Sequence, residues 1–181
     1  MHCLHWLAES GTAAIVCFPG IMYRGGAEQK IRKYLIDNNF IDCIIQLPDN
    51  LFFGTSIATC IMVLKKGKEN DNSVLFIDAG REFEKVTNSN KLKEQNISQI
   101  LSAYETRVDA EYFAKIVKNE AIAEQDYNLS VSTYVEQEDT REVINIVELN
   151  AEIERIVARE DILRREINAI ISEIEGGNSN E

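Results

Sequence analysis

Four short apolar runs lie in the first 80 residues, and polar or turn-forming residues end each of them. The runs cover residues 12–18, 41–47, 57–64 and 74–79, and between the first two, residues 27–36 repeat apolar side chains at helical spacing. Each run has the length of a strand and is apolar at nearly every position, as expected for strands buried on both faces. The pattern predicts an α/β sheet with helices on its faces.

The middle of the chain has a weaker pattern. Residues 81–94 are polar, and a helix is expected from about Asn96, with Ile97, Ile100, Leu101 and Tyr104 on one face. Asn119 is expected to cap a short helix over residues 120–125. The alternation in residues 131–135 predicts an extended segment.

The last segment has the clearest periodicity, since apolar residues recur every three or four positions from Ile146 to Ile174. Glu160 is the one polar residue at these positions, and Gly176-Gly177 is expected to end the helix. The stripe predicts a coiled-coil interface formed by Leu149, Ile153, Ile156, Leu163, Ile167 and Ile170. Because a helix with such a stripe is unstable alone in water, its apolar side chains are expected to pack against another helix or surface. Its acidic surroundings favour a helical protein partner over DNA; the alternatives are the chain's own domain and a second copy.

The net charge of −11 is unevenly distributed along the chain. Residues 1–66 hold six basic and five acidic residues, which leaves 13 basic and 25 acidic residues for the remainder. Any nucleic-acid contact is therefore expected in the first third, and the remainder is expected to avoid DNA. No apolar stretch approaches the length of a membrane span, and no secretory signal is visible, so the expected location is the cytoplasm.

The cysteines and histidines give little support for a metal site. Cys17, Cys43 and Cys60 fall within apolar runs, and no pair has CxxC spacing. His2, Cys3 and His5 have no further ligands at finger-like spacing downstream. We expect reduced thiols and no metal.

Four segments together resemble one protein family. Residues 47–66, with Leu-Pro, Phe-Gly-Thr-Ser-Ile and Thr-Cys-Ile-Met-Val-Leu-Lys-Lys, are similar to the strand-loop-strand element of type I restriction-modification methyltransferase subunits. Residues 13–35, 74–79 and 126–129 match further segments in the same order. Ordered matches over about 130 residues are far more specific than any single motif. The chain thus resembles the C-terminal part of an adenine-specific DNA methyltransferase subunit.

The resemblance implies an enzyme that swings an adenine out of the duplex and methylates its exocyclic amine from S-adenosylmethionine. A flipped base needs an aromatic or apolar surface to replace its lost stacking. In the family, an aromatic residue of the loop matching residues 50–56 packs against that base, so we expect Phe53 first and Phe52 second to take this role. The alternative is that both phenylalanines anchor the loop in the core.

Other residues of the same region are weaker candidates for contacts with substrate or DNA. Gly54 is expected to supply a special backbone conformation, and Thr55 and Ser56 to bond locally or to DNA phosphate. Arg24 precedes a helix start, where an arginine and free amides can hold an anion, although a solvated loop arginine is the commoner case. Lys65 and Lys66 are best explained as a charged strand end.

Two sequence features of such enzymes are absent from this chain. It contains no Gly-x-Gly turn for S-adenosylmethionine, and its only prolines, Pro19 and Pro48, cannot form the Asn/Asp-Pro-Pro loop that binds the target amine. We therefore expect a fragment that begins just after that loop, holds no catalytic residue, binds no cofactor alone and does not methylate DNA alone. The rival interpretation is a non-catalytic interaction module on a methyltransferase-like scaffold.

The predicted fold is an α/β, partial Rossmann-like methyltransferase sheet followed by a mixed region and a long C-terminal helix. Its expected parts are residues 1–80, 81–140 and 141–175, with a disordered tail at 176–181. An incomplete sheet should expose an edge or an apolar face and so promote association. The expected partners are the missing N-terminal half, the specificity subunit at the helix, DNA in the intact complex, and for the isolated chain a second copy.

Overall fold

A computed structural model describes residues 1–68, 72–87, 89–137 and 146–177. The chain divides into two compact units, residues 1–138 and residues 139–181, which are described separately. The first unit contains a five-stranded sheet in the order β1-β3-β2-β4-β7. The strands are β1 (Thr12–Cys17), β2 (Ile41–Gln46), β3 (Cys60–Lys65), β4 (Ser73–Asp78) and β7 (Ala114–Lys118). β2 and β4 are parallel, while β3 and β7 run against their neighbours.

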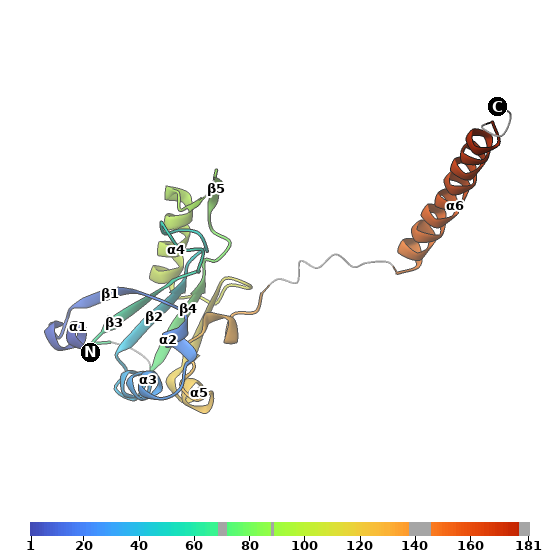
Figure 1. The fold of residues 1–181 in the computed structure, drawn as a ribbon. Coiled ribbons are helices and arrows are strands. Elements are labelled where there is room, and N and C mark those ends of the chain that lie inside the picture. The colour runs from blue at the N-terminus through green and yellow to red at the C-terminus, as the bar shows by residue number, and fades with distance from the viewer. Residues whose placement is uncertain (69–71, 88, 138–145, 178–181) are drawn as a thin grey trace. The chain divides into compact units, whose positions relative to one another are not determined.

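Successive residues of the central strands are buried in opposite faces of the sheet, as their continuous apolar sequence predicts. In β4, Phe76 belongs to one core with helices α2 (Gly20–Tyr23), α3 (Ala27–Asp37) and α5 (Asn119–Glu124). Leu75 and Ile77 belong to a second core with helix α4 (Glu94–Thr106). Figure 1 shows α3 and α5 together on one side of the sheet and α4 away from them. The predicted α/β sheet covered on both faces is confirmed.

The first strand departs from the prediction of a buried strand. Along β1, exposed residues alternate with half-buried ones, and Val16 remains 55% exposed. The reason is its place at the edge of the sheet, where β3 is its one neighbour among the described strands. One long edge of β1 therefore presents unpaired backbone groups.

The polar stretch after β4 forms a two-stranded hairpin. Its strands are β5 (Glu84–Val86) and β6 (Ser89–Lys91), which pair antiparallel. The expected helix follows as α4, with Ile100 buried and Tyr104 half-buried, whereas Ile97 and Leu101 remain partly exposed at 43% and 51%. The short helix α1 (His2–Trp6) and strand β7 were not predicted.

Two local predictions near the end of this unit are wrong. Asn119 does not cap α5, because Lys118 holds the N-cap position and the Asn119 side chain donates hydrogen bonds to the Ile36 carbonyl and to Asn39. Residues 131–135 do not form an extended segment but begin with a 3-10 turn, η1 (Val131–Thr133). Val131 and Val135 are both buried while Thr133 is exposed, a pattern that a strand with period two cannot produce.

A buried carboxylate ties α4 to the sheet. Asp42 Oδ2 accepts a hydrogen bond from Tyr104 Oη at 2.7 Å and lies 3.0 Å from Lys65 Nζ, while Oδ1 accepts one from Arg107 Nη1 at 3.0 Å. Burial alone would raise the pKa of Asp42, but the Tyr104 hydrogen bond and the two cations outweigh burial and lower it.

Asp42→Asn is expected to lower the free energy of unfolding by about 1–3 kcal/mol at neutral pH, because it removes the charge that the two partly exposed cations face. A lowered folded-state pKa gives stability that is present above the unfolded carboxyl pKa of about 3.9 and is lost as pH falls through the folded value. Urea unfolding across pH should therefore show the two proteins converging in strong acid. The exposed Asp37, paired with Lys33, is the control, and Asp37→Asn should change stability by less than about 0.5 kcal/mol. A difference that is independent of pH would contradict this assignment.

The second unit contains one long helix, α6 (Ile146–Gly177). Every described side chain from Ile146 to Ser172 is exposed. The six apolar residues of the predicted stripe, from Leu149 to Ile170, are 46–61% exposed. Glu160 pairs along the helix with Arg164, at 2.9 Å between Oε1 and Nη2. Of the disordered tail expected at 176–181, residues 176 and 177 belong to α6 instead, and residues 178–181 lie outside the described residues.

Candidate functional site

Three chain segments meet at one end of the sheet. Cys17 of β1 and Gln46 of β2 both pair with Cys60, and Gln46 also pairs with Asp78 of β4, so the carboxyl ends of these three strands lie at the same end of the sheet. The segments that follow them are residues 18–26, 47–59 and 79–93. Ligand sites of open α/β sheets form at the carboxyl ends of strands, which makes this end the candidate site.

Residues 47–59 include the predicted target-base loop, residues 50–56, and this whole segment, called the target-base loop below, is closed at its base and open at its tip. Leu47 N donates to the Thr59 carbonyl at 2.8 Å, and both residues are buried. At the tip, Asn50 and Gly54 adopt left-handed conformations with φ of 49° and 79°. The hydrogen bond at the base and the left-handed residues at the tip together determine the direction in which the loop extends from the sheet.

The two phenylalanines of this loop differ in exposure. Phe53 is fully exposed, at 108%, whereas Phe52 is 43% exposed. Thr55 Oγ1 accepts a hydrogen bond from Ile57 N at 3.2 Å, which is a local turn contact, and Ser56 is exposed. The loop thus presents an aromatic ring to solvent at the sheet edge where ligands are expected.

Arg24 lies on the neighbouring segment, residues 18–26. It is exposed, and its guanidinium folds over Gly20, where a Cβ would lie 3.0 Å from Arg24 Cζ. A side chain at position 20 would therefore displace the flexible end of Arg24. The loop that carries Phe53 joins β2 to β3, and β3 pairs with β1, so the segments of Arg24 and Phe53 leave neighbouring strands at the same end of the sheet.

A buried arginine that was not predicted as a site residue holds this segment. Arg32 of α3 donates hydrogen bonds to the carbonyls of Ile21, Arg24 and Tyr127 at 2.7–2.8 Å. Burial lowers the pKa of Arg32, while nearby Glu28 opposes that shift. Leu129 N adds a hydrogen bond to the Met22 carbonyl, so residues 126–129 buttress residues 18–26. The sequence held one signal for this role: Arg32 lies on the same face of α3 as the buried Leu35 and Ile36, and a cation on a buried face needs hydrogen-bond partners.

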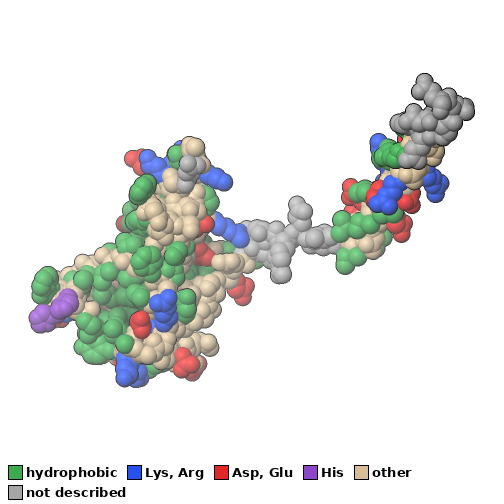
Figure 2. All heavy atoms as spheres, viewed as in Figure 1, with side chains coloured by type: hydrophobic (Ala, Val, Ile, Leu, Met, Phe, Trp, Pro, Cys, Tyr) green, Lys and Arg blue, Asp and Glu red, His purple; other side chains and the backbone are tan. Residues whose placement is uncertain are grey.

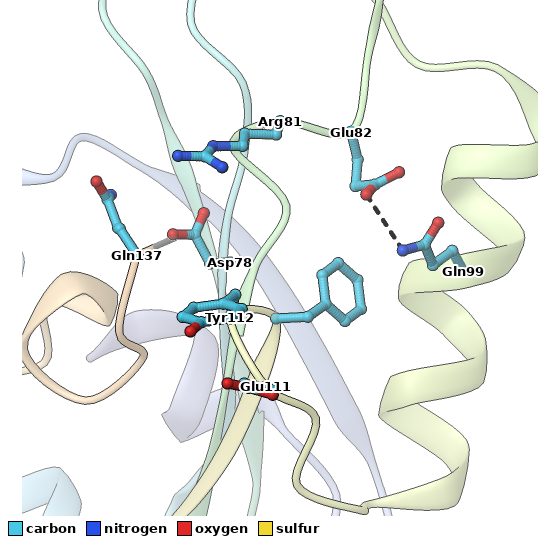
Figure 3. A pocket seen from close by; sticks show the side chains of 8 residues that line it. Asp78, Arg81, Glu82, Gln99, Glu111, Tyr112 and Gln137 are labelled. Carbon is cyan, nitrogen blue, oxygen red and sulfur yellow. Dashed lines mark hydrogen bonds between the residues drawn. The ribbon is translucent and has the colours of Figure 1, made fainter. Parts of the chain in front are cut away.

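Beside the third segment lies a cavity of about 290 Å³, shown in Figure 3. Glu82 accepts a hydrogen bond from Gln99 on its wall at 3.1 Å. Asp78, Glu82 and Glu111 line the cavity with a single cation, Arg81. This balance disfavours phosphate and leaves the loop tip, rather than the cavity, as the candidate contact with nucleic acid.

Apolar side chains gather at another part of the unit. Figure 2 shows green side chains around α1 and β1, with the two purple histidines at their margin. Trp6 is 83% exposed and Phe18 is 59% exposed in this region. Exposed apolar groups beside an unpaired strand edge mark an interaction surface.

In the part of the chain that the structure describes, no three His, Cys, Asp or Glu side chains are grouped so that they could hold a metal ion. Among the same residues, no helix combines the length and apolar character needed to span a membrane.

Comparison with known proteins gives a consistent set of matches. Residues 1–143 match the profile of the family described as N-6 DNA Methylase. The chain is 46% identical, over 96% of its length, to the type I restriction enzyme MpnII methylase subunit of Mycoplasma pneumoniae, and 38% identical, over 90%, to the MjaVII methylase subunit of Methanocaldococcus jannaschii. It covers 32% and 28% of these two proteins, so the chain spans about a third of their length.

A solved structure gives the same result. The type I restriction-modification methyltransferase subunit from Streptococcus thermophilus is 43% identical and superposes with a TM-score of 0.72. The match covers 75% of this chain and 29% of that one.

Proposed function

The chain belongs to the N-6 DNA methylase family, and from this premise we propose that it is the part of a type I restriction-modification methylase subunit that contacts the target adenine and pairs with another subunit. The reaction of the whole subunit is transfer of a methyl group from S-adenosylmethionine to the adenine exocyclic amine. This chain contributes binding surface to that reaction and no catalytic group.

The exposed Phe53 carries the proposal. A base that leaves the duplex loses its stacking partners, and an aromatic ring at the protein surface replaces them. Phe53 is fully exposed at the tip of a loop whose base is fixed by buried residues, at the carboxyl edge of the sheet. Phe52, less exposed, secures the loop beside it, while Thr55, Ser56 and Arg24 line the approach of the DNA backbone.

We assign the cofactor site and the catalytic loop to the remainder of the subunit. The chain has neither Gly-x-Gly nor adjacent prolines, so it lacks the turns that approach S-adenosylmethionine and the target amine. The open edge of β1 and the exposed Val16, Trp6 and Phe18 support docking of that remainder, because a further strand would satisfy the edge and cover the apolar groups.

The apolar stripe of α6 is the proposed interface with the specificity subunit. Residues Leu149, Ile153, Ile156, Leu163, Ile167 and Ile170 are exposed at heptad spacing over most of the helix. A helix of this kind is stabilised when its stripe packs against a partner helix.

A chimeric methylase tests the proposal. The matched third of the Mycoplasma pneumoniae subunit is replaced by this chain, and the chimera is assembled with that system's own specificity subunit. Radiolabelled methyl transfer to the cognate DNA is expected from the chimera and not from the isolated chain. Transfer by the isolated chain would show that it holds a catalytic apparatus. A folded, correctly assembled chimera without transfer would show that the chain does not perform the relative's role.

A further inference from the structure

The hairpin formed by β5 and β6 lies directly against the target-base loop. Asn90 N donates a hydrogen bond to the Asn50 carbonyl at 2.9 Å. The Asn90 side chain donates two more, to the carbonyl and to Oδ1 of Asp49, at 2.9 and 2.8 Å. Asn90 is also the only buried residue among the hairpin's strand positions, at 9% exposure. The hairpin therefore fixes the loop at Asp49 and Asn50, just before the two phenylalanines.

One lysine shares the face of the hairpin that meets the loop. Lys85 is the cross-strand partner of Asn90, and such partners lie on the same face of a two-stranded ribbon. Lys91 is paired with Glu84 in the register and lies on the opposite face. Lys93 forms an ion pair with Glu84. Lys85 is exposed, and among the described residues it takes part in no ion pair.

The charge of this segment is opposite to that of the region around it. Residues 81–93 hold four basic and two acidic residues, although the chain beyond residue 66 is strongly acidic. Figure 2 shows blue side chains at the end of the unit where Figure 1 labels β5. Residues 47–59 contain a single charged residue, Asp49, whose carboxylate Asn90 binds. The loop therefore has no cation of its own, and Lys85 is the cation on the hairpin face beside it.

We propose that the β5–β6 hairpin is a second DNA-contacting element, in which Asn90 positions the target-base loop and Lys85 binds a backbone phosphate beside the extruded adenine. The inference rests on the proposed function and adds a contact outside the loop. It departs from the expectation that any nucleic-acid contact lies in the first third of the chain.

The chemistry of base extrusion explains why both residues are needed. Rotating a nucleotide out of the duplex requires the backbone on either side of it to be held, and a lysine ammonium does this by neutralising phosphate. The ring that receives the base must also be held in place, since a loop that shifts loses the stacking geometry. Asn90 and Lys85, on one face of one hairpin, couple these two requirements.

Hydrogen-deuterium exchange of the 181-residue chain tests the positioning role. Asn90→Ala removes two hydrogen bonds to Asp49, so amides of residues 49–57 should exchange about tenfold faster. Ser89→Ala, an exposed neighbour, is the control and should leave the loop unchanged. The double variant Asp49→Asn/Asn90→Asp exchanges donor and acceptor and should restore part of the protection. Unchanged loop exchange in Asn90→Ala overturns the positioning role.

Fluorescence anisotropy with a labelled duplex carrying one adenine-cytosine mismatch tests the phosphate contact. Lys85→Gln should weaken binding several-fold and reduce the dependence of log affinity on log salt by about one unit. Lys91→Gln makes the same charge change on the opposite face and should leave that slope unchanged.

The outcomes separate this inference from the proposed function. If Lys85→Gln and Lys91→Gln behave alike while Phe53→Ala weakens binding, the hairpin contact is wrong and the role of the loop stands. If the unmodified chain shows no binding that depends on Phe53, the proposed DNA contact fails and the hairpin inference fails with it. Melting temperatures of Lys85→Gln, Lys91→Gln and Phe53→Ala should match that of the unmodified chain, because all three side chains are exposed.

Discussion

Phe53→Ala in the chimeric methylase is expected to lower kcat/KM for methyl transfer by about 10- to 100-fold. Stacking of one base on an aromatic side chain contributes about 1–3 kcal/mol, and each 1.4 kcal/mol corresponds to a factor of about ten. The whole ring of Phe53 is exposed, so the substitution removes no core contact and the thermal stability should be unchanged. Methyl transfer is measured together with 2-aminopurine fluorescence at the target position, which reports base extrusion directly.

Phe52 provides the matched comparison within the loop. Its ring is 43% exposed, so Phe52→Ala should lower stability as well as activity, and the activity loss should be the smaller of the two. Tyr34→Ala removes an exposed aromatic ring that packs near Phe40, outside the three site segments, and should leave transfer unchanged. A larger activity loss for Phe52→Ala than for Phe53→Ala would contradict this assignment and show that Phe52 is the stacking residue.

The central strands were predictable because burial on both faces leaves a continuous apolar sequence. β2 and β4 are apolar at most positions, and each is buried at every position except its last. The same signal correctly predicted a strand at β1 but wrongly predicted that it is buried, since an apolar run does not reveal whether a sheet continues beyond it. β7 was not predicted for a related reason. Its sequence, Ala114–Lys118, contains two lysines and lacks a continuous apolar run, and it forms a strand by pairing with β4, which lies far from it in the sequence.

The candidate site was only half visible in the sequence. Phe53 could be named because its loop follows a strand and resembles a family motif. Asn90 could not, because it lies in a polar stretch and its partners are 41 residues away. Arg32 reaches a carbonyl 95 residues away. Residues that position a loop through long-range hydrogen bonds leave no periodic pattern, and only the fold brings them together.

The C-terminal helix is the subject of the other large effect. Leu163→Asp/Ile167→Asp is expected to lower affinity for the specificity subunit by more than about 100-fold, because two carboxylates would be buried in an apolar interface without partners. Both positions are on the outer surface of α6, at 49% and 55% exposure, so the helix itself should persist. Isothermal titration calorimetry measures the affinity, and circular dichroism checks the helix content.

Off the stripe, Ile162→Asp/Asn168→Asp adds the same two charges to the same helix and should leave the affinity nearly unchanged. Equal loss in both double variants would mean that net charge, rather than the stripe, governs the interaction.

Light scattering of the isolated chain tests the alternative partner, a second copy of the chain. Glu160 lies in the stripe between Ile156 and Leu163, so self-pairing in register would bring two carboxylates together, while a partner helix with a cation at that level would not. A stable dimer that Leu163→Asp/Ile167→Asp dissociates would therefore replace the specificity subunit with a second copy as the occupant of the stripe.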